Sequence, residues 1–183
     1  IAIIGTGNVG LITGTCLAQV GNHIICYDID LKKINSLKEG KIDIYDSGLD
    51  KLVLQNLDSS LFFSNNIKKT VESSDIIFLT VGTPMNSDGS TNMDYIYAAA
   101  NDLGTYMDSN KLIITKSTIP VGETHAIKDI IDSKIENMGK KISFDIANNP
   151  EFLKEGRGVD DFMSPDRIIV GVDDKSLEKI FTD

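Results

Sequence analysis

The stretch Ile1 to Gly10, IAIIGTGNVG, decides the fold. Its four leading apolar residues predict a short buried strand, and the G-x-G-x-x-G turn that follows opens directly into a helical pattern. Gly5 permits the tight turn, Gly7 lets the backbone approach a pyrophosphate, and Gly10 lets the helix pack close to the strand. The N-terminus of that helix offers unpaired N–H groups and a positive dipole end. The stretch therefore predicts a dinucleotide-binding site.

An acidic residue, Asp28, ends the next predicted strand, His23 to Tyr27. A carboxylate at this position can accept hydrogen bonds from an adenosine ribose, and it would repel a 2′-phosphate. NAD is therefore favoured over NADP as the cofactor. Lys32 and Lys33 lie near enough in sequence to weaken this preference.

Apolar strands alternate with helical patterns along the rest of the chain. We expect further strands at residues 61–63, 75–81, 111–116, 142–147 and 167–172, and helices at 9–20, 31–38, 49–57, 66–72, 93–107 and 121–138. Such βαβ units predict an α/β fold, a Rossmann-like, doubly wound, mostly parallel sheet with helices on both faces. Residues 1 to about 150 would form the core of a single domain, and residues 151–183 an extension that ends in an unfinished helix, SLEKIFTD.

Composition narrows the class of protein. Of the 183 residues, 41% are hydrophobic and 25% charged, which is ordinary for a folded domain. The formal net charge of −9 argues against a nucleic-acid partner, which would need clustered Lys and Arg. No window approaches the roughly 20 apolar residues of a membrane span, so we expect no membrane partner. The chain starts inside a strand and without Met, so we expect a piece of a longer protein.

The cysteines and histidines predict neither a metal site nor a nucleophile. Cys16 and Cys26 fall in an apolar helix face and an apolar strand, which predicts reduced core residues in a cytoplasmic protein. His23 and His125 stand alone in the sequence, without other residues at metal-ligand spacing.

Two loops after predicted central strands carry hydroxyl groups. Thr83 precedes Pro84, and Ser117 and Thr118 lie in the segment KSTIP. Because ligands bind beyond the carboxyl ends of parallel strands, these hydroxyls would lie over a nicotinamide, where they can hold water or a carboxamide. The same residues could equally be ordinary loop caps.

The segment NNPEFLKEG, residues 148–156, leaves the sixth strand with two carboxylates four residues apart. If the chain turns helical at Phe152, Glu151 and Glu155 approach the same face. One could then act on water as a base while the other orients cofactor or substrate. A solvated helix start, with Glu151 near its positive end, is the alternative. Further on, Arg167 could contact a phosphate or sugar, or form an ion pair with a nearby aspartate.

Taken together, these segments resemble the nucleotide-sugar 6-dehydrogenases of the UDP-glucose/GDP-mannose dehydrogenase family. The similarity covers essentially the whole chain, in the order IAIIGTGNVGLITG, YDID, VGTPMNSDGSTNMDY, KSTIPVG, NNPEFLKEGRGVDDF and SPDRIIVG. PEFLKEG followed by PDRIIVG resembles members that oxidise UDP-glucose more than those that act on GDP-mannose or UDP-N-acetylmannosamine. The family oxidises the sugar 6-hydroxyl to a carboxylate with two molecules of NAD, through a thioester on a cysteine.

The resemblance implies a role for each of the segments. The residues implied to bind the cofactor are Gly5, Gly7, Asn8, Val9, Gly10, Asp28, Lys33, Thr83, Thr118 and Glu155. Glu151 and Thr118 are implied to be catalytic, Glu151 in proton transfer or thioester hydrolysis and Thr118 in positioning water. The residues implied to bind the sugar nucleotide are Glu151, Phe152, Leu153, Lys154 and Glu155. Asn8 stands where the family usually has an aromatic or another variable residue, which affects packing over the cofactor.

The family's catalytic cysteine belongs to a later G-x-C-x-P-K-D segment, which this sequence does not contain. The later central helix and substrate-binding domain are also expected outside it. We therefore expect this chain to bind NAD without turnover and the parent protein, expected to be a homo-oligomer, to be the enzyme. Two other interpretations stay open. One is a Rossmann module that senses NAD and catalyses nothing. The other is a related hydroxyacid or phosphogluconate dehydrogenase, which would need a catalytic lysine after the sheet.

Overall fold

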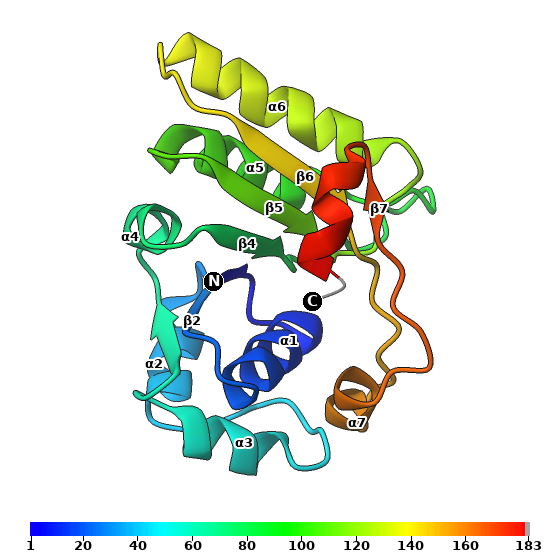
Figure 1. Cartoon of the computed structure of the whole chain (residues 1–183). Coiled ribbons are helices and arrows are strands. Elements are labelled where there is room, and N and C mark those ends of the chain that lie inside the picture. The colour runs from blue at the N-terminus through cyan, green and yellow to red at the C-terminus, as the bar shows by residue number, and fades with distance from the viewer. Residues whose placement is uncertain (182–183) are drawn as a thin grey trace.

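A seven-stranded sheet forms the middle layer of the computed structural model, which describes residues 1–181 (Figure 1). The strand order is β3-β2-β1-β4-β5-β6-β7, so the order reverses between β1 and β4. The first six strands are parallel, and β7 is antiparallel to β6. The strands are β1 (Ala2–Ile4), β2 (Ile24–Tyr27), β3 (Leu61–Ser64), β4 (Ile76–Leu79), β5 (Lys111–Thr115), β6 (Phe144–Asn148) and β7 (Gly171–Val172). The predicted doubly wound, mostly parallel sheet is confirmed.

Helices cover both faces of the sheet, as predicted (Figure 1). Those on one face are α4 (Ile67–Glu72), α5 (Asp94–Tyr106) and α6 (Glu123–Asn137). Those on the other are α1 (Asn8–Gln19), α2 (Leu31–Lys38), α3 (Leu49–Asn56) and α7 (Gly158–Met163). The 3₁₀ helix η1 (Lys175–Phe181) places Leu177 against β5 and β6.

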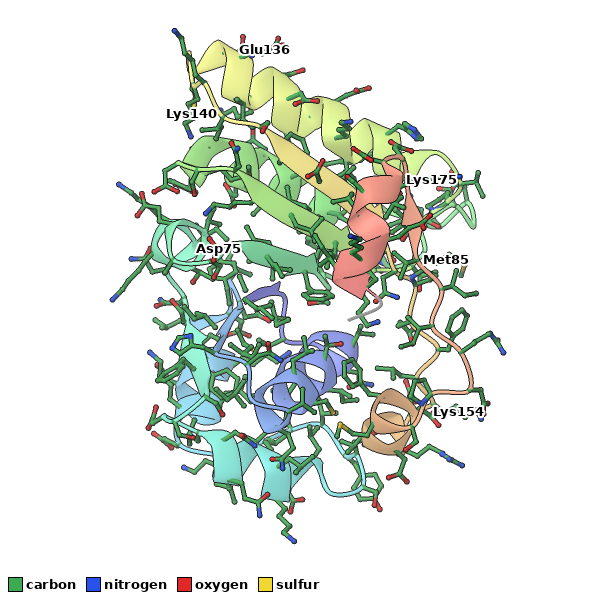
Figure 2. The ribbon with its side chains drawn as sticks, in the orientation of Figure 1. Asp75, Met85, Glu136, Lys140, Lys154 and Lys175 are labelled. Carbon is green, nitrogen blue, oxygen red and sulfur yellow. The ribbon has the colours of Figure 1, made fainter. Side chains whose placement is uncertain are left out.

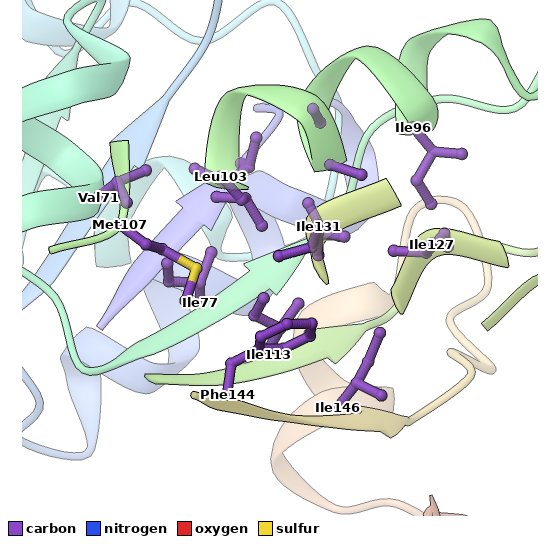
Figure 3. Packing of buried hydrophobic residues seen from close by; sticks show 14 of the residues in the cluster. Val71, Ile77, Ile96, Leu103, Met107, Ile113, Ile127, Ile131, Phe144 and Ile146 are labelled. Atoms are coloured by element: carbon purple, nitrogen blue, oxygen red, sulfur yellow. The ribbon is translucent and has the colours of Figure 1, made fainter. Parts of the chain in front are cut away.

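The alternation of side chains along each strand divides the core between the two faces. In β1, Ile3 packs with the helices of the α1 face, while Ala2 and Ile4 pack with those of the α5 face. Figure 3 shows the α5 face, where Ile77 and Ile113 of neighbouring strands lie beneath the helices. A strand between two helical layers must be apolar on both sides, which is why these strands are continuous apolar runs.

The C-terminal extension departs from its prediction. No helix begins at Phe152; residues 151–157 form a loop, and α7 starts only at Gly158. The Glu151 carboxylate accepts the N–H of Leu153 at 2.6 Å, which is a local turn that competes with helix formation. Gly156 then has φ +86°, in the left-handed region, and the chain changes direction there before α7 begins.

The last strand and the final helix are also smaller than expected. Only residues 171–172 of the predicted strand 167–172 pair with the sheet, and they do so antiparallel to β6. The segment before them contacts the end of β6 through a side chain, since the Asn149 amide donates to the carbonyl of Ile169 at 2.8 Å. The expected helix is 3₁₀ over Lys175–Phe181, and the last two residues of SLEKIFTD lie outside the described residues.

Candidate functional site

Two glycines of the first turn are required by the chain itself. Gly5 has φ +100°, and its N–H donates to the carbonyl of Tyr27 at 2.8 Å, which joins the turn to the end of β2. A Cβ on Gly10 would lie 1.9 Å from the carbonyl oxygen of Gly5 and 2.6 Å from the hydroxyl of Thr80. Helix α1 can therefore approach the end of β1 only because residue 10 has no side chain.

Gly7 differs from these two glycines. Its φ of −68° suits any residue, and no atom lies within 4 Å of the position that its Cβ would take. Gly7 is the N-cap of α1, and no side chain caps the helix there. The N–H groups of the first turn, which have no intrahelical acceptor, are therefore left for an anion. The fold itself therefore does not require a glycine at position 7.

Asp28 faces the glycine turn across the end of the sheet. Its Oδ2 accepts hydrogen bonds from the N–H of Thr6 at 2.9 Å and from the Thr6 hydroxyl at 2.7 Å, and its Oδ1 accepts the N–H of Asp30 at 3.0 Å. Lys33 Nζ lies 3.9 Å from Oδ2. Burial raises the pKa of Asp28, but the hydrogen bonds from Asp30 and Thr6 and the charge of Lys33 outweigh it and hold the pKa below its usual value. Asp28 is thus an ionised acceptor that also braces the turn.

A cavity of about 360 Å³ joins these groups. Gly5, Gly7, Asp28 and Lys33 line it, so the structure brings together four of the predicted cofactor residues. Asn8, Val9 and Gly10 do not line the cavity and form the first turn of α1 beside it.

Sequence reasoning missed one whole wall of this cavity. The residues of α5 that line it are Tyr95, Ala98, Ala99 and Asp102. Their spacing, i, i+3, i+4 and i+7, is that of one helix face, so the signal was present in the sequence. Two alanines in that stripe leave room for a flat group between α5 and the end of β2.

A second, smaller cavity of about 130 Å³ collects residues of the loop after β6. Glu151, Phe152 and Leu153 line it together with Lys116 and Arg167. The Arg167 guanidinium stacks over the Phe152 ring at 4.6 Å. The expected alternative, an ion pair between Arg167 and an aspartate, does not form among residues 1–181.

Lys116, at the end of β5, is a cavity residue that sequence reasoning missed. Its Nζ donates to the Asn149 side chain at 3.0 Å, and its side chain is buried. Burial lowers the pKa of Lys116, while the charge of Glu151 acts in the opposite direction. A buried cation and a carboxylate therefore face the same small volume.

The remaining predicted residues lie outside both cavities. Lys154 and Glu155 are exposed, and Figure 2 shows Lys154 beside α7. The Thr83 hydroxyl donates to the carbonyl of Thr118 at 2.8 Å, which ties the loops after β4 and β5 together. Ser117 is buried and donates to the carbonyl of Val81 at 2.7 Å, so the loop-cap interpretation holds for this hydroxyl.

The loop after β6 is fixed from a distant part of the chain. The buried Asp46 carboxylate accepts the N–H groups of Gly158 at 2.6 Å and Val159 at 3.0 Å, and the N–H of Ser47 donates to the carbonyl of Gly156. Asp46 therefore caps α7 and fixes the end of the loop formed by residues 151–157.

Both cysteines are buried and free, as predicted. Burial, and then the charge of Asp46, raise the pKa of Cys16 to about 12, and burial raises that of Cys26 further. Such thiols are poor nucleophiles. Within residues 1–181, no helix has the length and hydropathy to cross a bilayer, and no three potential ligands among His, Cys, Asp and Glu gather as a metal site would require.

The NAD binding domain model of the UDP-glucose/GDP-mannose dehydrogenase family matches residues 1–183. The chain belongs to this family. The dinucleotide that the glycine turn and Asp28 predict is therefore NAD. The residues that line the cavity fit the pyrophosphate and the adenosine of NAD. The space beside Gly7 is open, and Asp28 is an ionised hydrogen-bond acceptor.

Similar proteins include UDP-glucose 6-dehydrogenase TuaD of Bacillus subtilis, 45% identical over 172 residues, which are 93% of this chain and 37% of that protein. The solved UDP-glucose dehydrogenase of Pyrobaculum islandicum is 31% identical with a TM-score of 0.89, over 98% of this chain and 42% of that one. The solved GDP-mannose dehydrogenase of Pseudomonas aeruginosa is 28% identical with a TM-score of 0.88, over 98% of this chain and 42% of that one. This family member thus spans about two-fifths of the length of these relatives.

Proposed function

We propose that this chain is the NAD-binding part of a nucleotide-sugar 6-dehydrogenase that oxidises UDP-glucose to UDP-glucuronate with two molecules of NAD. The observation that carries the proposal is the cavity in which the open position at Gly7 faces the ionised carboxylate of Asp28. The similarity to TuaD supports UDP-glucose as the sugar nucleotide. The fold alone does not separate the substrates, because the GDP-mannose dehydrogenase is nearly as similar in structure.

At the cofactor end, the N–H groups of the first turn of α1 bind the pyrophosphate, assisted by the helix dipole. Asp28 accepts a ribose hydroxyl with the lone pairs that Thr6 and Asp30 leave free, and its charge repels a 2′-phosphate. Lys33 lies beside this carboxylate at the adenosine end. When NAD is bound, it supplies a hydride acceptor.

At the substrate end, we assign the sugar nucleotide to the second cavity and its rim, residues 151–155. Glu151 is the acid or base for proton transfer and thioester hydrolysis, and it shares this cavity with Lys116. Thr118, exposed and held by Thr83, positions water. Glu155 meets cofactor and substrate only if the loop closes over them, because it is exposed in this structure.

The remaining parts of the proposal concern the whole protein. The catalytic thiol comes from outside this sequence, because Cys16 and Cys26 are buried with raised pKa values. Residues 1–150 form the cofactor core and residues 151–183 the substrate extension, while the rest of the substrate site is supplied by a second domain. The protein is cytoplasmic and a homo-oligomer, with neither nucleic acid nor membrane as partner; the net charge of −9 supports the exclusion of nucleic acid.

The cofactor part is tested by titrating this chain with NADH and with NADPH while following nicotinamide fluorescence. We expect NADH to bind more tightly. Equal affinities, or tighter binding of NADPH, would contradict the role given to Asp28.

The substrate part is tested on the full-length protein that carries this chain, supplied with NAD and either UDP-glucose, GDP-mannose or UDP-N-acetylmannosamine. We expect NADH to form with UDP-glucose. Glu151→Gln should slow NADH formation at least about 100-fold without changing NADH affinity, while Glu136→Gln, on the far end of α6 (Figure 2), should change neither. NADH binding without turnover of any sugar nucleotide would favour an NAD-sensing module.

A further inference from the structure

The cavity that holds Asp28 continues beyond it, along one face of α5. Tyr95, Ala98, Ala99 and Asp102 form this wall. Since a helix rises 1.5 Å per residue, the stripe is about 10 Å long, which is the length of a nucleoside. A dinucleotide with its pyrophosphate at Gly7 and its ribose at Asp28 must place its base along this wall.

The far end of the wall lies near the end of β2. Burial, and then the charges of Asp102 and Asp28, raise the pKa of Tyr27, so both carboxylates lie within electrostatic reach of its hydroxyl. Ile67, at the start of α4, also lines the cavity, and α4 packs against α5. Asp102 therefore lies at the base end of the cavity and not at the phosphate end.

The chemistry of this end suits a flat ring with one polar edge. Its walls are the side chains of Ile29, Ile67, Ala98 and Ala99, which can cover the two faces of a purine. Asp102 places an acceptor-only group among them.

No group in the described part of the chain donates a hydrogen bond to Asp102. Within residues 1–181, the influences on its pKa are burial, which raises it, and the charge of Lys134, which lowers it, with no hydrogen bond among them. A half-buried carboxylate without a donor is unfavourable, and a ligand N–H would relieve this.

We propose that the Asp102 carboxylate accepts a hydrogen bond from the exocyclic amino group of adenine and thereby selects adenine over 6-oxo purines. The inference rests on the proposed binding of NAD. A 6-oxo purine places a carbonyl oxygen where adenine has the amino group, and two acceptors would then face each other. Selection thus combines an attraction to adenine with a repulsion of the alternative base.

The test compares NADH with its deaminated analogue, reduced nicotinamide hypoxanthine dinucleotide, by nicotinamide fluorescence on this chain. The two ligands share the nicotinamide, both riboses and the pyrophosphate, so the ratio of their affinities reports the base alone. We expect NADH to bind at least about tenfold more tightly, which is the effect of one hydrogen bond to a charged group.

Asp102→Asn keeps the size of the side chain and can present either a donor or an acceptor, so the ratio should fall below about threefold. Asp102→Ser is a second variant that removes the charge in a smaller side chain. Asp129→Asn is the matched control, since Asp129 is exposed on α6, away from the cavity, and its substitution changes the net charge equally; it should keep the wild-type ratio.

The role of Asp102 would be overturned if the wild-type chain bound the two dinucleotides with equal affinity. It would also be overturned if both Asp102 variants kept the ratio of the two affinities that the wild type shows. A folded wild-type chain that binds neither dinucleotide would instead refute the proposed cofactor function, and the two failures are therefore distinguishable.

Discussion

Gly7 and Gly10 belong to the same turn, yet replacing them should have opposite consequences. Apart from its chain neighbours, a Cβ at Gly7 meets no atom within 4 Å, and the residue has an ordinary φ of −68°. Gly7→Val should therefore change the free energy of unfolding by less than about 1 kcal/mol, since a small loss at the N-cap is offset by a less flexible unfolded chain. Its side chain occupies the space through which a pyrophosphate reaches the first turn of α1.

Loss of two hydrogen bonds to a charged phosphate would weaken NADH at least about 100-fold. Gly10→Ala places a Cβ 1.9 Å from the Gly5 carbonyl oxygen, so α1 must move. We expect it to destabilise the fold by about 1–3 kcal/mol or more.

The assay is urea unfolding of the wild type and both variants, with a fluorescence titration of NADH and with thermal unfolding in the presence and absence of NADH. The cofactor should raise the melting temperature of the wild type and not that of Gly7→Val. The reasoning is refuted if Gly7→Val binds NADH like the wild type, or if it unfolds as readily as Gly10→Ala.

Four other outcomes are expected for Asp28, Asp46 and Cys16. Asp28→Asn should weaken NADH more than NADPH, so the ratio of the two affinities in fluorescence titrations falls; an unchanged ratio would remove the ribose assignment. Because the folded pKa of Asp28 is depressed, its contribution to stability is present at neutral pH and is lost as the pH falls below about 4, so unfolding of Asp28→Asn should depend less on pH in that range than unfolding of the wild type. Asp46→Ala leaves the N–H groups of Gly158 and Val159 without their acceptor and should lower the free energy of unfolding by about 1–3 kcal/mol in urea, whereas an effect below 0.5 kcal/mol would show that the cap is dispensable. Cys16, with its pKa raised to about 12, should react with a thiol reagent at pH 8 only after unfolding, and rapid reaction in the folded chain would contradict its burial.

Features that depend on neighbours in sequence were predictable. The glycine turn is a local pattern, and Asp28 is found by following one strand, so the three residues of 1–28 that were expected to meet in one cavity, Gly5, Gly7 and Asp28, could be named from the sequence. The sheet was equally accessible, since buried parallel strands must be continuous apolar runs. The hydrogen bond between Asp28 and Thr6 was not predictable, because that contact exists only once β1 and β2 lie side by side.

Features that depend on tertiary contact were missed. The spacing of Glu151 and Glu155 fits a helix, but the carboxylate of Glu151 closes a turn on Leu153 and the helix starts later. The residue that caps this helix, Asp46, lies more than a hundred residues away in sequence, so no local pattern could reveal the cap. The α5 wall was readable as a stripe, yet nothing in the sequence says that this stripe faces a ligand.

The double use of Asp28 limits how the cofactor preference of this protein can be re-engineered. Converting an NAD enzyme to NADP normally begins by neutralising the carboxylate that repels the 2′-phosphate. Here a substitution that removes both carboxylate oxygens also removes the acceptor for the N–H and the hydroxyl of Thr6, and the glycine turn loses its brace. A successful conversion must therefore keep an oxygen acceptor within reach of the Thr6 N–H, which comes from the backbone and stays whatever residue stands at position 6.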